Sequence, residues 1–133
     1  MDIQNLAYAV TQIVHNFGAV TVVGGAVFAL VRRETEIQRR LAWMVLAGWL
    51  VQAVSGATFR AISYYYYAKF PDIHGFAVAA LIVKVVCATL GFTLAGWQLI
   101  AQHTEASHRY YWITLCCLGV LALSSAAVLR WFS

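Results

Sequence analysis

The sequence is poor in charged residues, in acidic residues above all, and in proline. Only 11% of its 133 residues are charged, five are Asp or Glu, and one is proline. Soluble domains carry about 25% charged and about 45–50% apolar residues, whereas this chain is 62% hydrophobic. The composition therefore places the chain among membrane proteins. The scarcity of proline favours long, unbroken helices.

Cysteine is also scarce, and the excess of basic residues is small. Cys87, Cys116 and Cys117 lie within apolar runs and form no CxxC pair, so neither a disulfide framework nor a thiolate metal site is indicated. The net charge is +4, but the basic residues group at the ends of apolar runs. Topology and lipid headgroups account for that placement better than a nucleic acid does. The N-terminus has no basic region or small-residue cleavage site, so we expect no cleaved signal peptide.

Four apolar runs are long enough to cross a bilayer. A hydrocarbon core about 30 Å thick needs about 20 apolar residues as a helix, and in lipid the backbone must satisfy its own hydrogen bonds. The short connections imply antiparallel neighbours. The sequence therefore predicts an all-α, single-domain integral membrane protein, an antiparallel four-helix bundle with transmembrane helices at about residues 6–31, 41–64, 74–101 and 110–131.

The basic residues are divided unevenly between the two ends of this predicted bundle. Four arginines lie at residues 32–40 and Arg109 lies in the third connection, whereas the other end carries Arg60, Lys69 and Arg130. By the positive-inside rule, the first and third connections are cytoplasmic. Both termini are then expected outside.

Two polar side chains that are unfavourable in a membrane lie within the apolar runs, at the same predicted depth. His15 lies about nine residues into the first run and Lys84 ten residues into the third, so both are about 14 Å below the outer surface. A lysine at the centre of a membrane helix costs about 2.5–3.5 kcal/mol, and no acidic residue lies within any run. We expect the two residues to act together. Lys84 then loses its proton, pairs with an acidic group of a ligand, or faces water.

Further polar residues have the spacing to line a pocket with His15 and Lys84. Gln52 and Arg60 belong to a stripe of residues four apart, which share one helix face. Gln12 lies on the face of His15, and His74 lies at the mouth of the third helix. Interhelical hydrogen bonding is the alternative role for a single intramembrane histidine. The predicted cofactor-binding residues, in the outer half of the bundle, are Gln12, His15, Gln52, Arg60, His74 and Lys84. Close-packing contacts between helices are predicted at Gly18, Gly24, Gly25, Gly48, Gly56 and Gly91.

Haem b, with His15 as the metal ligand, is one group that these residues could hold, and an anionic lipid would also suit Lys84. His15 and His74 differ in depth by about 13 Å, which makes them a poor pair for one iron. A second axial ligand would come from a lysine, from water or from another subunit, while Lys84 would pair with acidic substituents. Copper is less favoured, because neither methionine lies near the pocket and Cys87 alone could join His15.

Two segments resemble a known family. Residues 15–28, HNFGAVTVVGGAVF, followed by two arginines, resemble the first helix of copper-resistance D-type (CopD-like) membrane domains and of the related HemJ-type protoporphyrinogen oxidases. Residues 80–92, ALIVKVVCATLGF, resemble the lysine-bearing third helix of that group, with Lys84 in the place of its lysine. The resemblance implies a multi-pass protein of the bacterial inner membrane. It also implies that His15 and Lys84 act in haem or porphyrinogen chemistry, or in copper handling.

Three hypotheses for the function follow. In the first, a haem, porphyrin or quinone-like redox group binds in the pocket for electron transfer or porphyrinogen oxidation; His15 ligates iron or moves protons, and Lys84 and Arg60 hold acidic substituents. In the second, the chain is a non-enzymatic accessory subunit that packs in a larger membrane complex or in a homo-oligomer. The third is copper handling or transport. Where HemJ-type chains carry a histidine close before the lysine, this chain has Ile82 and Val83, so oxidase activity is left open.

Overall fold

The computed structural model describes residues 2–68, 75–101 and 105–132, and they form four α-helices and no strand. The helices are α1 (Ile3–Val31), α2 (Thr35–Tyr67), α3 (Phe76–Ile100) and α4 (Glu105–Phe132). Each contains a stretch that is long and apolar enough to cross a membrane. The predicted all-α fold with four membrane-spanning helices is thereby confirmed.

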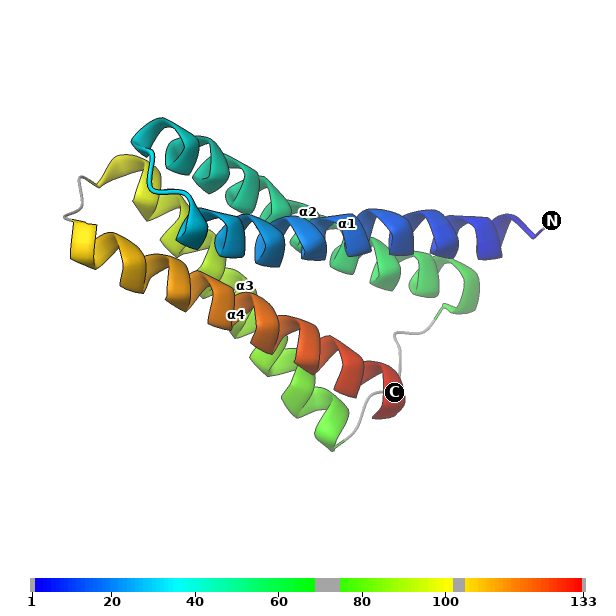
Figure 1. The fold of residues 1–133 in the computed structure, drawn as a ribbon. Coiled ribbons are helices and arrows are strands. Elements are labelled where there is room, and N and C mark those ends of the chain that lie inside the picture. Colours follow the sequence, from blue (N-terminus) through cyan, green and yellow to red (C-terminus); the bar gives the residue numbers. More distant parts are fainter. Residues whose placement is uncertain (1, 69–74, 102–104, 133) are drawn as a thin grey trace.

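The helices pair as two antiparallel hairpins, α1 with α2 and α3 with α4 (Figure 1). α1 also packs on α4, and α2 on α3, whereas the diagonal pairs make no close backbone contact within the described residues. The hairpins lie together at the packed end, where α1 passes into α2, and diverge toward the open end, where α1 begins and α4 ends (Figure 1). Which end faces the cytoplasm stays a prediction from the arginine distribution.

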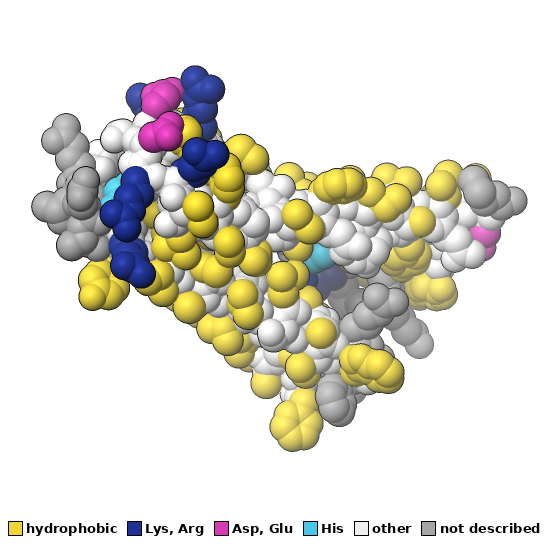
Figure 2. Space-filling view, in the orientation of Figure 1, with side chains coloured by type: hydrophobic (Ala, Val, Ile, Leu, Met, Phe, Trp, Pro, Cys, Tyr) yellow, Lys and Arg dark blue, Asp and Glu magenta, His cyan; other side chains and the backbone are white. Residues whose placement is uncertain are grey.

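The hydrophobic core occupies the packed half of the bundle. It is built from the second half of α1, the first half of α2, the middle and second half of α3, and the first two thirds of α4. Many of its members are small, which lets helix backbones approach closely. Apolar side chains also cover the flanks of the molecule, and charged side chains gather mainly at the packed end (Figure 2). The buried core consists of Val22, Ala26, Ala29, Leu41, Ala42, Val45, Trp49, Cys87, Ala95, Tyr111, Trp112, Leu115 and Ala122.

Helix α2 begins six residues before the predicted apolar span, so the predicted connection 32–40 shrinks to residues 32–34. Glu36 lies in the first turn and accepts a hydrogen bond from Arg40 Nε at 3.2 Å. Such an i,i+4 pair supports a helix in water. Hydropathy marks where a helix leaves the lipid, not where the helix ends, because charged residues are good helix formers.

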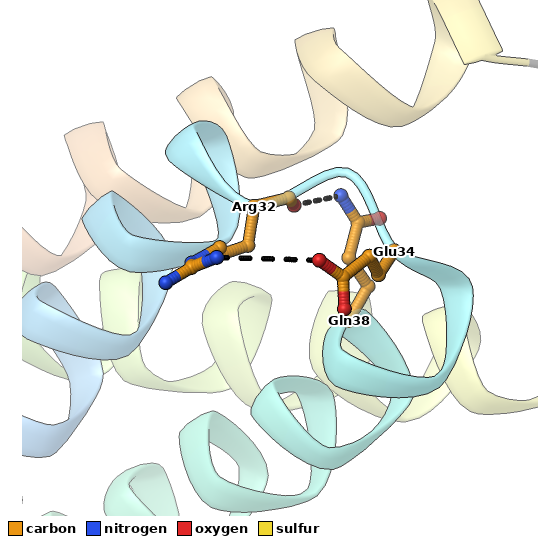
Figure 3. Close-up of polar contacts among 3 residues, drawn as sticks. All are labelled: Arg32, Glu34 and Gln38. Carbon is orange, nitrogen blue, oxygen red and sulfur yellow. Dashed lines mark hydrogen bonds and ion pairs between the residues drawn. The ribbon is translucent and has the colours of Figure 1, made fainter.

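The α1–α2 connection is closed by one buried amide. Gln38, which is 9% exposed, donates from Nε2 to the carbonyl oxygens of Arg32 at 2.7 Å and Ala29 at 3.3 Å. Both carbonyls belong to the end of α1, where helical partners run out. Figure 3 shows the contact with Arg32 beside the exposed ion pair of Arg32 and Glu34, whose atoms are 4.0 Å apart.

We expect the Gln38→Ala variant to lose about 1–3 kcal/mol of unfolding free energy, because two carbonyls of the α1 end lose their donor. Glu34→Gln, which breaks only the exposed ion pair, should change stability by less than about 0.5 kcal/mol. Unfolding in detergent by titration with sodium dodecyl sulfate, followed by helical circular dichroism, measures both. Equal losses in the two variants would contradict the role of Gln38.

Candidate functional site

Three polar side chains from three helices meet near the middle of the bundle. His15 on α1 is 8% exposed. Its Nδ1 lies 2.7 Å from Ser55 Oγ on α2, and its Nε2 lies 3.1 Å from Lys84 Nζ on α3. We call His15, Ser55 and Lys84 the histidine cluster. The contact between His15 and Lys84 confirms the prediction that they share one depth.

Close packing of α1 on α2 brings His15 to Ser55. A Cβ added at Gly18 would lie 2.9 Å from Val51 Cγ1 and 3.3 Å from the carbonyl oxygen of Gly48. A Cβ added at Gly48 would lie 3.2 Å from the carbonyl oxygen of Gly18, so the two glycines together allow this close approach. One turn from Gly48, the Gln52 amide donates to the carbonyl oxygen of His15 at 2.5 Å. This bond ties α2 to the backbone that carries the histidine.

Lys84 reaches the cluster across the diagonal of the bundle. Helices α1 and α3 make no close backbone contact within the described residues, so the long lysine side chain spans the space between them. The half-buried lysine places its amine within hydrogen-bond distance of the imidazole. The cluster thereby connects the two hairpins.

The histidine cluster borders a groove with a volume of about 1600 Å³, which all four helices line. Most of the lining is apolar. Two cationic side chains line the groove, Lys84 and Arg60, and within the described residues no Asp or Glu does. Figure 2 shows the hollow between the diverging arms, with histidine and basic atoms at its inner end. The groove therefore presents positive charge from an apolar wall.

The other predicted site residues have different places. Gln52 lines the groove and holds the His15 carbonyl. Gln12 and Arg60 are exposed on the groove wall, and Gln12 donates to Asn16 Oδ1 at 2.7 Å instead of contacting the cluster. Arg60 lies five residues beyond Ser55, about 7.5 Å nearer the open end along the helix. His74 lies outside the described residues, so its predicted place at the mouth of the third helix stays a prediction.

Two residues of the site were not predicted from the sequence. Ser55 bonds to His15, and the Phe59 ring meets the imidazole edge-on with the ring centroids 5.8 Å apart. The available signal was spacing, because Ser55 follows Gln52 by three residues and so shares its helix face. A serine in a membrane helix commonly bonds to its own backbone, and that made it easy to overlook.

Cys87 and His15, the predicted copper ligands, do not line the groove together. Cys87, the candidate partner of His15, is 5% exposed and packs in the core instead of lining the groove. In the described part of the chain, no three His, Cys, Asp or Glu side chains lie together as a metal would require. Copper handling therefore rests on the sequence resemblance alone.

Comparisons of the chain with protein-family models, with curated proteins and with solved structures give no match. The resemblance to copper-resistance D-type and HemJ-type proteins stays a prediction. The groove and the histidine cluster are the features from which a function can be argued.

Proposed function

We propose that this chain is a multi-pass membrane protein that binds an acidic, ring-shaped redox group in the groove, haem b or another porphyrin, for electron transfer or porphyrinogen oxidation. The observation that carries the proposal is the unbalanced charge of the groove. Lys84 and Arg60 line it, and no acidic residue of the described chain does. An ammonium group in the membrane interior costs about 2.5–3.5 kcal/mol. An acidic substituent of a bound molecule would supply the missing opposite charge.

The size and walls of the groove suit a flat apolar ring. Its volume of about 1600 Å³ exceeds the roughly 300–1,000 Å³ of pockets for drug-sized ligands. Ala53, Gly56 and Ala57 line it from α2, and Ala126 and Ala127 line it from α4. These small side chains leave room between α2 and α4 for a flat ring with its acidic edge toward Lys84.

His15 could also bind the iron of a haem, provided that Lys84 moves away from its Nε2. Histidines that bind a metal usually donate their other ring N–H to a neighbour, and Nδ1 of His15 is already bonded to Ser55. An iron ligand would therefore be Nε2, and Lys84 Nζ, now 3.1 Å from it, would move to the acidic substituents. Among the described residues that line the groove, His15 is the single histidine. A bound haem would supply the one-electron chemistry.

A second candidate function is that of an accessory subunit in a larger membrane complex. The observation that favours it is the open side of the groove, where apolar side chains remain accessible. Phe92 is 44% exposed and Trp131 is 86% exposed, and both line the groove. A helix of a partner could cover them in place of a cofactor.

The visible spectrum of the protein purified in mild detergent tests the two functions. We expect a Soret band, in the chain as isolated or after addition of haem b, that His15→Ala abolishes because the groove loses its imidazole. His108→Ala is the control, since His108 bonds to Gln98 at the packed end and does not line the groove.

Two results would contradict the binding of haem b through His15. One is a band of unchanged intensity in His15→Ala. The other is a colourless chain that takes up no haem and co-purifies with a large membrane complex, which would favour the accessory subunit. Copper content, measured on the same sample, tests the third hypothesis.

A further inference from the structure

We propose that Ser55 is a positioning residue that fixes the tautomer of His15. In this tautomer Nδ1 carries the hydrogen, and the lone pair of Nε2 points to Lys84. Ser55 thereby sets where the lysine amine stands in the groove. The inference deepens the proposed function and rests on it, because the lysine is the group that would meet the acid of the ligand.

The hydrogen bonds of Ser55 decide the tautomer. Ser55 Oγ lies 2.5 Å from the carbonyl oxygen of Val51 and 3.4 Å from that of Gln52. A carbonyl oxygen can only accept, and a serine hydroxyl has one hydrogen to donate. That hydrogen therefore goes to the backbone. Toward His15 Nδ1, 2.7 Å away, Ser55 Oγ presents lone pairs, so Nδ1 must be the donor.

The assignment at Nδ1 also decides the hydrogen-bonding role of Nε2, on the other side of the imidazole. In a neutral imidazole with the hydrogen on Nδ1, Nε2 is an acceptor. Lys84 Nζ, at 3.1 Å, is then its donor. In the opposite tautomer, the lone pair of Nδ1 would face the lone pairs of Ser55 Oγ. Only the first arrangement satisfies both contacts of the ring.

The surroundings leave Ser55 without a substitute. Ser55 is 4% exposed and His15 is 8% exposed, so water has little access to Nδ1. Phe59 meets the ring edge-on at 5.8 Å between centroids, and Gln52 holds the backbone of His15. These contacts fix the position of the ring, but neither of them accepts a hydrogen from Nδ1. Without Ser55, a hydrogen on Nδ1 would be a buried donor with no acceptor, which costs about 1–3 kcal/mol.

Nitrogen NMR of the full chain in detergent, with ¹⁵N-labelled histidine, reads the tautomer directly. The His15 signals are assigned by their loss in His15→Ala. We expect the hydrogen on Nδ1 in the native chain and in Ser55→Thr, because threonine keeps the hydroxyl and the same bond to the backbone. In Ser55→Ala we expect a measurable share of the hydrogen to move to Nε2, because Nδ1 loses its acceptor while the Lys84 amine still favours a lone pair on Nε2.

The matched control is Ser125→Ala. Ser125 on α4 is 9% exposed and donates to the carbonyl oxygen of Leu121 at 2.8 Å, so its loss removes the same kind of backbone bond away from the cluster. The tautomer should not change. A second readout is affinity for haem b, which we expect to fall about 10-fold in Ser55→Ala and to recover in Ser55→Thr.

Two results would overturn the role of Ser55. One is a native chain with the hydrogen on Nε2, a measurement that stands even where a variant fails to fold. The other is a Ser55→Ala chain that keeps the native tautomer. Because the tautomer is read without any ligand, these results are separate from those of the haem experiment, in which failure to bind would overturn the proposed function instead.

Discussion

Replacing Lys84 by methionine is expected to weaken the binding of haem b at least tenfold and to leave the four helices folded. A hydrogen bond to a charged group contributes about 1.5–3 kcal/mol, which corresponds to about 10- to 150-fold in affinity. Methionine is unbranched and apolar, so it can fill the space of the lysine stem. Titration of the purified chain with haem b, followed at the Soret band, gives the affinity.

The same variant is expected to be at least as stable as the native chain when no ligand is bound. Removing the amine relieves up to about 2.5–3.5 kcal/mol of insertion cost, which offsets the loss of its charge-assisted bond to His15, a contribution of about 1.5–3 kcal/mol. Residues kept for function commonly show this opposition of stability and activity. If Lys84 served only to pack the helices together, Lys84→Met would instead lower the stability of the chain.

Thr89→Val is the control for this comparison. Thr89 also lies on α3 and lines the groove, but its hydroxyl donates to the carbonyl oxygen of Val85. Its replacement should change the affinity for haem b by less than about twofold, since no charged group is lost. Unchanged haem affinity in Lys84→Met would contradict the proposed role of the lysine as the partner of the acidic group.

The second large effect is expected at Gly91, where even alanine should destabilise the chain by about 1–3 kcal/mol. A Cβ there would lie 2.3 Å from Cε2 and 2.4 Å from Cζ2 of Trp49. The indole is 2% exposed and packed in the core, so the ring and its neighbours would have to shift to admit the methyl group. Titration with sodium dodecyl sulfate measures the loss.

Gly24 and Gly56 provide matched controls on α1 and α2. A Cβ at either position would meet no atom within 4 Å. Alanine should therefore be neutral or raise stability by up to about 0.5–1 kcal/mol, because it loses less backbone freedom than glycine on folding. A double variant that joins Gly91→Ala to Trp49→Phe should recover part of the loss, since the two sites are in contact. Equal stability of Gly91→Ala and Gly24→Ala would show that the contact is not tight.

The sequence by itself determined the four helices and the common depth of His15 and Lys84. Lipid requires each span to be a helix of about 20 apolar residues, and such runs can be counted. Helix rise is fixed at about 1.5 Å per residue, so residues on different helices can be compared in depth. The contact of 3.1 Å between Lys84 Nζ and His15 Nε2 agrees with that count.

Only the tertiary structure decided which faces meet. Gly91 receives the Trp49 ring, whereas Gly24 and Gly56, also predicted as packing contacts, have open space around them. Ser55 bonds to the imidazole, whereas the predicted Gln12 bonds to Asn16. The physical reason is that a membrane helix is apolar toward lipid as well as toward its neighbours. The pattern of apolar residues therefore fixes depth along each helix but leaves its rotation, and the divergence that opens the groove, to side-chain packing.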